Sequence, residues 1–133
     1  MIRNLLNSDM PRIILIGLAG FAGTLARYWL SGVVGRQYGE TFPYGTFAVN
    51  ALGCLLAGFL FYLMYDRFLT SPTSRSVVFI GFLGGFTTFS SYGLQTFTLL
   101  RDGEIFLALL NIGLSNIGGL FLVWAGYKLG GLV

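Results

Sequence analysis

Four long apolar stretches, each almost free of charge, divide this chain. Residues 41–65, 76–100 and 105–127 contain no Asp, Glu, Lys or Arg, and residues 13–35 contain only Arg27. A helix that crosses the hydrocarbon core of a bilayer needs about 20 apolar residues, and every stretch reaches that length. The pattern therefore predicts an all-α membrane protein with four transmembrane helices.

Short segments connect the stretches, at residues 36–40, 66–75 and 101–104. None is long enough for an extramembrane domain, so we expect residues 1–133 to form a single membrane-embedded four-helix domain. The first stretch is too long for the apolar region of a secretory signal, and no convincing cleavage site follows it. These features favour a retained first span.

Composition agrees with this class and disfavours others. Charged residues make up 10% of the chain, against about 25% in soluble domains. With so few charges, the net charge of +3 does not indicate nucleic acid as a partner. The chain has no histidine and a single cysteine, Cys54, so neither a zinc site nor a disulfide within the chain is expected. The sequence shows no nucleophile–base pair of the kind that would indicate an enzyme.

Charge gives little guidance on orientation. The side with both termini would carry five basic residues, and the other side two, or three if Arg27 is counted there. The positive-inside rule favours cytoplasmic termini, but the difference is small. A weakly encoded single topology and dual-topology insertion both agree with the sequence. Four helices cannot enclose a wide pore, and the recurring Gly and Ala residues favour close helix association, so we expect an oligomer.

Polar residues inside the spans are informative, because each must be satisfied by a partner or must face water. Arg27 can snorkel to the interface or attract anions to a vestibule, and its position favours neither. Asn50 offers two amide donors, either to another helix or to an anion. In the fourth stretch, Asn111 and Ser115 are four apart and share a helical face, whereas Asn116 is expected on a different face.

The third stretch carries a polar stripe and an aromatic stripe at helical spacing. They consist of Thr88, Ser91 and Gln95, and of Phe86, Phe89 and Tyr92. No stretch contains an acidic residue, although proton-coupled transporters use intramembrane carboxylates as relays. Uncharged donors and the positive edges of aromatic rings suit a small anion instead.

The segment "GGFTTFSS" at residues 84–91 is unusual at membrane depth. Glycine permits uncommon dihedral angles, and hydroxyls compete for backbone partners. A helix break is tolerated there only where it is buried in protein or lines a cavity. The sequence allows a kinked continuous helix or a true break, whose exposed carbonyls would suit Na⁺.

At these residues the chain resembles the Fluc (CrcB) fluoride channels of bacteria. The resemblance covers nearly the whole length and rests on "GFAGTLARY" at 20–28, "YGTFAVNALG" at 44–53 and "GFLGGFTTFSSYG" at 81–93. It implies an antiparallel, dual-topology homodimer in the bacterial inner membrane, with two pores and a third helix broken in each subunit. It also implies passive efflux of fluoride, which relieves fluoride toxicity.

The resemblance assigns roles to individual residues. It implies a central, structural Na⁺ at the dimer axis, bound by the backbone carbonyls of Gly84 and Thr87. Arg27 matches the arginine of the family's first helix, which would make the vestibule electropositive. The residues that match the pore and its hydroxyl track are Asn50, Phe89, Tyr92, Ser91 and Ser115.

Two positions depart from the family pattern. Tyr92 stands where the family has its second pore phenylalanine, and Gly119 where it has a second serine in the fourth helix. The phenol keeps the ring edge and adds a donor, so we expect conduction to survive. The alternative function is a small proton-coupled exporter of the multidrug type, which the absence of intramembrane carboxylates disfavours. A non-transporting assembly subunit is a third possibility.

Overall fold

The computed structural model describes residues 2–133, with side chains described from Asp9 onward. All regular secondary structure in this part of the chain is helical. Four helical segments are long and apolar enough to cross a membrane, which confirms the predicted all-helical, four-span architecture. They are Asp9–Tyr38, Tyr44–Arg67, Pro72–Arg101 and Ile105–Gly130.

The spans differ in how regular they are. The first is a single helix, and the other three include π-helical segments (η), in which the wider turn is closed by i→i+5 hydrogen bonds. In chain order, the elements are α1 (Ile2–Tyr38), α2 (Tyr44–Phe61), η1 (Tyr62–Arg67), α3 (Pro72–Arg75), η2 (Ser76–Leu83), α4 (Gly84–Phe86), α5 (Phe89–Arg101), α6 (Ile105–Gly113), η3 (Leu114–Gly118) and α7 (Gly119–Gly130).

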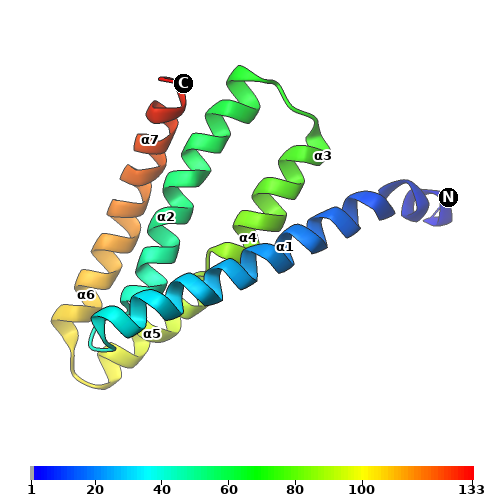
Figure 1. Ribbon diagram of the computed structural model, residues 1–133. Coiled ribbons are helices and arrows are strands. Elements are labelled where there is room, and N and C mark those ends of the chain that lie inside the picture. The colour runs from blue at the N-terminus through cyan, green and yellow to red at the C-terminus, as the bar shows by residue number, and fades with distance from the viewer. Residues whose placement is uncertain (1) are drawn as a thin grey trace.

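The most extensive helix contact is that of α2 with α7, which lie side by side (Figure 1). Glycine makes this approach possible. A Cβ atom at Gly58 would overlap the Val123 carbonyl, and one at Gly126 would overlap the Leu55 carbonyl. Backbone-to-backbone packing of this kind drives helix association in lipid, where the hydrophobic effect between helices is absent.

Helix α1 crosses the bundle and packs on η2, α4 and α2 (Figure 1). Gly23 faces the Phe82 carbonyl, and Gly85 of α4 faces the Gly20 carbonyl, so neither position has room for a Cβ atom. This contact fixes the first half of the third span against α1, up to the residues that precede α5.

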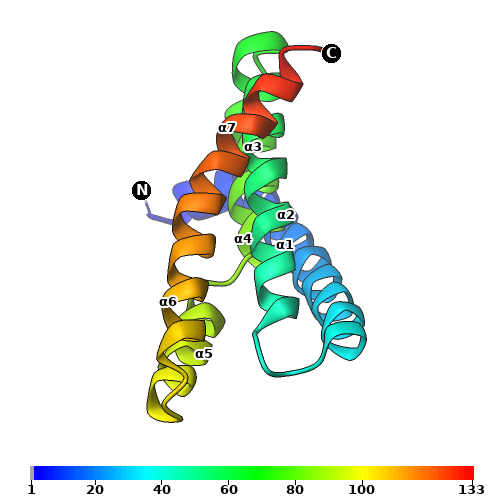
Figure 2. The same ribbon diagram turned by 90° about the vertical axis from the view of Figure 1, so that its left-hand side faces the viewer.

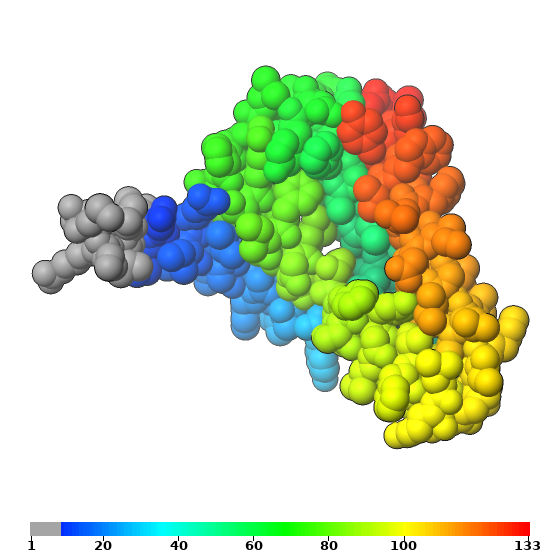
Figure 3. Space-filling model, turned by 180° about the vertical axis from the view of Figure 1, so that it is seen from behind, coloured from blue at the N-terminus to red at the C-terminus, as the bar shows by residue number. Residues whose placement is uncertain are grey.

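Helix α5 is placed differently. It packs chiefly against α6, and the two form a hairpin that extends away from the other helices (Figure 2). On the face shown in Figure 3, the surface is hollowed between the third span (green) and the fourth span (orange). The large apolar side chains on α5 are mostly exposed, including Phe89, Leu94, Phe97 and Leu100.

Candidate functional site

The third span is interrupted at two threonines. Helix α4 ends at Phe86, and Thr87 (φ −87°, ψ 158°) and Thr88 (φ −148°, ψ 114°) have extended dihedral angles. Helix α5 then begins at Phe89. Extended backbone at membrane depth leaves polar groups that need partners other than the helix itself, and the following contacts supply several of them.

Asn50 of α2 binds the backbone of Thr88 with both ends of its amide. The Thr88 N–H donates to Asn50 Oδ1 at 2.8 Å, and Asn50 Nδ2 donates to the Thr88 carbonyl at 3.0 Å. In a continuous helix the Thr88 N–H would return to the carbonyl of Gly84, four residues earlier. The Gly84 carbonyl therefore loses its helical donor, and Gly84 is exposed.

Thr88 also begins the next helix. Its side-chain oxygen accepts from the backbone N–H of Ser91 at 3.2 Å, as an N-cap residue does, and its hydroxyl donates to Ser91 Oγ at 3.1 Å. In an uninterrupted helix the Ser91 N–H would bind the Thr87 carbonyl. The interruption thus removes the helical donors of both Gly84 and Thr87.

Arg27 reaches the same interruption from α1. Its Nε donates to the carbonyl of Gly85 at 3.0 Å, so the guanidinium satisfies one carbonyl at the C-terminal end of α4. A cation at a helix C-terminus also complements the helix dipole. Neither of the roles considered for Arg27 from its position included this contact, which joins residues 58 apart in the sequence.

A cavity of about 400 Å³ lies beside the interruption. It brings together six of the eight residues that the resemblance assigns to the pore, the vestibule and the Na⁺ site, whereas Arg27 and Ser91 are outside its lining. The lining consists of Asn50, Gly53, Cys54, Ala57, Phe79, Leu83, Gly84, Thr87, Thr88, Phe89, Tyr92, Ser115 and Asn116.

Asn116 is a cavity residue that the sequence pattern did not reveal. The α-helical periodicity places it on a different face from Asn111 and Ser115, and Asn116 is exposed whereas Asn111 is buried. Ser115 and Asn116 nevertheless both line the cavity. Both lie in η3, the π-helical segment Leu114–Gly118, in which neighbouring residues are less far apart around the axis than in an α-helix.

A ladder of polar side chains, buried at Asn111 and Thr96, joins the fourth span to α5 beside the cavity. The Ser115 hydroxyl donates to Asn111 Oδ1 at 3.3 Å, and Asn111 Nδ2 donates to Thr96 Oγ1 at 2.9 Å. The Thr96 hydroxyl donates to the Tyr92 carbonyl at 2.8 Å. Asn111 is 2% exposed, so the ladder fixes the register of the two helices at a point that water does not reach.

The aromatic residues at the cavity are open to the surroundings of a single chain. Phe89 is 82% exposed, and its ring centroid lies 5.5 Å from that of Tyr92. An apolar ring this exposed at the edge of the chain is free to contact lipid or a second protein surface.

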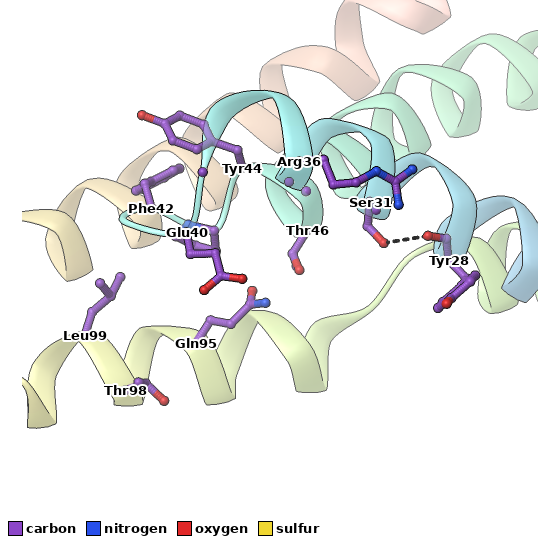
Figure 4. Close-up of a pocket in the computed structure, with 15 residues that line it drawn as sticks. Tyr28, Ser31, Arg36, Glu40, Phe42, Tyr44, Thr46, Gln95, Thr98 and Leu99 are labelled. Atoms are coloured by element: carbon purple, nitrogen blue, oxygen red, sulfur yellow. Dashed lines mark hydrogen bonds between the residues drawn. The ribbon is translucent and has the colours of Figure 1, made fainter.

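A second, larger cavity of about 590 Å³ lies between the end of α1, the segment that leads to α2, and α5 (Figure 4). Its lining includes Tyr28, Arg36, Glu40 and Gln95. Gln95 belongs to the polar stripe expected on the third span, but none of the residues assigned to the pore or the Na⁺ site lines this cavity. The cavity at Thr87 and Thr88 is therefore the candidate site.

The fold and this cavity define a small polytopic membrane protein with a site of mixed polar and aromatic side chains where its third span is interrupted. The family model described as CrcB-like protein, Camphor Resistance (CrcB), matches residues 14–127. The chain belongs to the CrcB family.

Curated relatives match along most of their length. One from Hydrogenovibrio crunogenus is 44% identical over 115 residues, which cover 86% of this chain and 87% of the relative. One from Geotalea daltonii is 45% identical over 117 residues, covering 88% and 94%. One from Solidesulfovibrio magneticus is 43% identical over 124 residues, covering 93% and 99%. Each of these relatives is named fluoride-specific ion channel FluC.

Proposed function

We propose that this protein is a fluoride-selective channel that lets fluoride leave the cell passively and so relieves fluoride toxicity. The proposal is supported by the names of its relatives and by family membership. The observation that carries it is the grouping of Asn50, Phe89, Tyr92 and Ser115 around one cavity beside the interrupted third span. Hydrogen-bond donors and aromatic ring edges thus lie together at membrane depth.

This chemistry suits a small, strongly hydrated anion. A selective pore must replace the water that the ion loses, and several side chains at the cavity can donate. One Nδ2 hydrogen of Asn50 binds the Thr88 carbonyl, which leaves its second hydrogen for an anion. The Ser115 hydroxyl can rotate toward an ion, and the ring edges of Phe89 carry partial positive charge.

Passive flow fits the absence of acidic residues within the apolar stretches. Hydrogen fluoride is a weak acid that crosses membranes uncharged and ionises in the more alkaline cytoplasm. The anion is then trapped, and a channel releases it down its electrochemical gradient. No intramembrane carboxylate is needed for such a path, whereas a proton-coupled exporter requires one.

We propose an antiparallel, dual-topology homodimer in the bacterial inner membrane as the working unit. The exposure of Phe89 in a single chain supports a second protein wall for the pore. The small difference in basic residues between the two sides of the membrane is compatible with insertion in both orientations.

We also propose that Na⁺ binds at the interruption. The carbonyls of Gly84 and Thr87 fit such an ion, because the Thr88 and Ser91 N–H groups that would occupy them in a continuous helix bind Asn50 and Thr88 side chains instead. Carbonyl oxygen is a suitable ligand for a hard cation. Bound Na⁺ would neutralise carbonyl dipoles that lipid cannot satisfy. Replacing Na⁺ by a large organic cation during purification should lower the thermal stability of the dimer, and an unchanged unfolding temperature would contradict the proposal.

The primary test is ion release from liposomes reconstituted with the purified protein, with fluoride and chloride followed in parallel by selective electrodes. Rapid fluoride release without chloride release is expected. If a folded preparation released neither ion, the channel proposal would be overturned and an assembly subunit would be favoured.

A matched pair of variants then tests the cavity. Phe89→Ile removes the aromatic ring at the cavity, and Phe97→Ile makes the same change on an exposed residue of the same helix outside the cavity lining. We expect the first variant to lose fluoride release and the second to retain it. Equal flux from both variants would remove Phe89 from the ion path.

A further inference from the structure

The contacts of Tyr92 and Asn116 carry an inference that rests on the proposed function and makes it more specific. Both side chains line the cavity at the interruption. Asn116 Nδ2 donates to the carbonyl of Ile112 at 2.8 Å and to the phenol oxygen of Tyr92 at 3.0 Å. The two helices η3 and α5 are thereby linked by side chains at the wall of the cavity.

This geometry determines which atom donates. The Ile112 carbonyl can only accept, so the Asn116 atom that binds it must be the amide nitrogen. The same nitrogen contacts Tyr92, and an amide nitrogen has no acceptor capacity. The Tyr92 oxygen must therefore be the acceptor in this contact, and its own proton must point elsewhere.

The Tyr92 proton is available at the cavity. Among the residues whose side chains are described, no acceptor for it is recorded. Asn116, in contrast, commits both of its amide hydrogens, one to each acceptor, so it offers no donor of its own to an ion. Its effect on an ion has to act through Tyr92.

We propose that Tyr92 donates its phenol proton to the permeating anion and that Asn116 is the positioning residue that keeps this hydroxyl oriented as a donor. The pair supplies one charge-assisted hydrogen bond in addition to the donors of Asn50 and Ser115. It recognises a small anion that accepts strongly, which favours fluoride over chloride.

The test compares Tyr92→Phe, Asn116→Leu and the double variant in reconstituted liposomes, with fluoride release measured over a range of fluoride concentrations. Tyr92→Phe removes the hydrogen bond to the charged anion, and Asn116→Leu releases the hydroxyl that makes this bond, so the half-saturating fluoride concentration should rise by about tenfold in either single variant. Since Asn116 acts through Tyr92, the double variant should show no further rise. Tyr38→Phe is the matched control, because it removes a phenol from an exposed residue outside the cavity lining.

The outcomes separate this inference from the proposed function. A wild-type protein that releases no fluoride contradicts both the channel function and the role of Tyr92 and Asn116. Wild-type flux with an unchanged half-saturating concentration in Tyr92→Phe contradicts the phenol donor. A normal value in Asn116→Leu, or an added effect of Asn116→Leu in the Tyr92→Phe background, contradicts the positioning role.

A second readout does not depend on conduction. Fluoride that binds the folded state should raise the unfolding temperature of the detergent-solubilised protein. Tyr92→Phe and Asn116→Leu should each need about ten times more fluoride for the same rise, with Asn116→Ala as the substitute if the leucine variant does not fold. An identical fluoride dependence in wild type and Tyr92→Phe would overturn the proposal.

Discussion

The two halves of the third span are held by different forces. The first half, α3 to α4, packs against α1 through backbone contacts at glycine, and its buried residues are Ser76, Gly81, Leu83 and Phe86. The second half, α5, has one buried residue, Thr96, and is joined to the fourth span by side-chain hydrogen bonds. One span therefore combines an anchored half and a half whose outer face is free.

This difference explains where a site can form. Backbone packing at glycine leaves no space for an ion, and it holds α4 in one position against α1. The polar contacts of α5 fix its register on α6 while leaving Phe89 and Tyr92 at the cavity. The interruption at Thr87 and Thr88 separates the half that packs through glycine from the half that is held by side-chain hydrogen bonds. Asn50 of α2 and Arg27 of α1 donate hydrogen bonds to backbone carbonyls at this interruption.

The largest effect is expected from adding one carbon atom to the anchored half. Gly85→Ala would place a Cβ atom against the Gly20 carbonyl, so α1 and α4 must separate. Overpacking of this kind costs about 3 kcal/mol, and we expect a clear loss of thermal stability in detergent.

The matched change in the free half is Gly93→Ala, because no atom beyond the local backbone of its own helix would lie within 4 Å of a Cβ atom there. Alanine favours a helix over glycine by about 1 kcal/mol, so this variant should be as stable as the wild type or slightly more stable. Similar losses in the two variants would show that the halves are not held differently.

A somewhat smaller loss is expected at the boundary. Asn50→Leu removes both bonds to the Thr88 backbone and leaves an N–H and a carbonyl unpaired, which should cost about 2 kcal/mol. Thermal unfolding measures this loss, and fluoride release should stop as the cavity loses its amide donor.

Asn50→Asp separates the structural role from the anion contact. The carboxylate can still accept from the Thr88 N–H, but it cannot donate and it repels anions. We expect partial recovery of stability relative to Asn50→Leu with no recovery of fluoride release. Normal fluoride release from the aspartate variant would restrict Asn50 to a structural role.

The sequence predicts the spans well, because a bilayer imposes its thickness on every crossing segment and charge-free stretches are visible without any structure. The residues of the pore, the vestibule and the Na⁺ site could be assigned through the resemblance to a family with the same motifs. Six of these eight residues line one cavity.

The partners of these residues could not be predicted, because they depend on contacts between distant parts of the chain. The bond from Asn50 to Thr88 joins residues 38 apart, and the bond from Arg27 to Gly85 joins residues 58 apart. Asn116 was not assigned to the site for the same reason, because its place there depends on a contact with Tyr92, 24 residues away.

A moderate effect is expected within the free half. Thr96→Val and Asn111→Leu each break the buried bond between α5 and α6. Polar pairs in membrane proteins contribute about 0.6 kcal/mol on average, so each variant should lose a few degrees of unfolding temperature at most. The double variant should lose less than the sum, because neither partner remains unpaired.

Thr98→Val serves as the control for this pair. Thr98 makes the same type of bond, from its hydroxyl to the carbonyl four residues earlier, but no bond to the fourth span is recorded for it among the described side chains. Its double variant with Asn111→Leu should be additive. If the stability losses of Thr98→Val and Asn111→Leu departed from additivity as much as those of Thr96→Val and Asn111→Leu, the hydrogen-bonded ladder would not be what joins α5 to α6.

The smallest effect is expected at the far end of α5, where Arg101 and Asp102 form an ion pair with 2.8 Å between Nε and Oδ1. The hydrogen bond from Arg101 lowers the pKa of Asp102 below its ordinary value. A carboxyl group with a lowered pKa stabilises the folded state above its ordinary pKa, near 4, and this contribution is lost as the pH falls through the lowered value. Both side chains are exposed, so solvent and salt screen the pair. Asp102→Asn should therefore leave the unfolding temperature at pH 7 unchanged. A marked loss would mean that the ion pair at the C-terminal end of α5 stabilises this helix in addition to its hydrogen bonds to the fourth span.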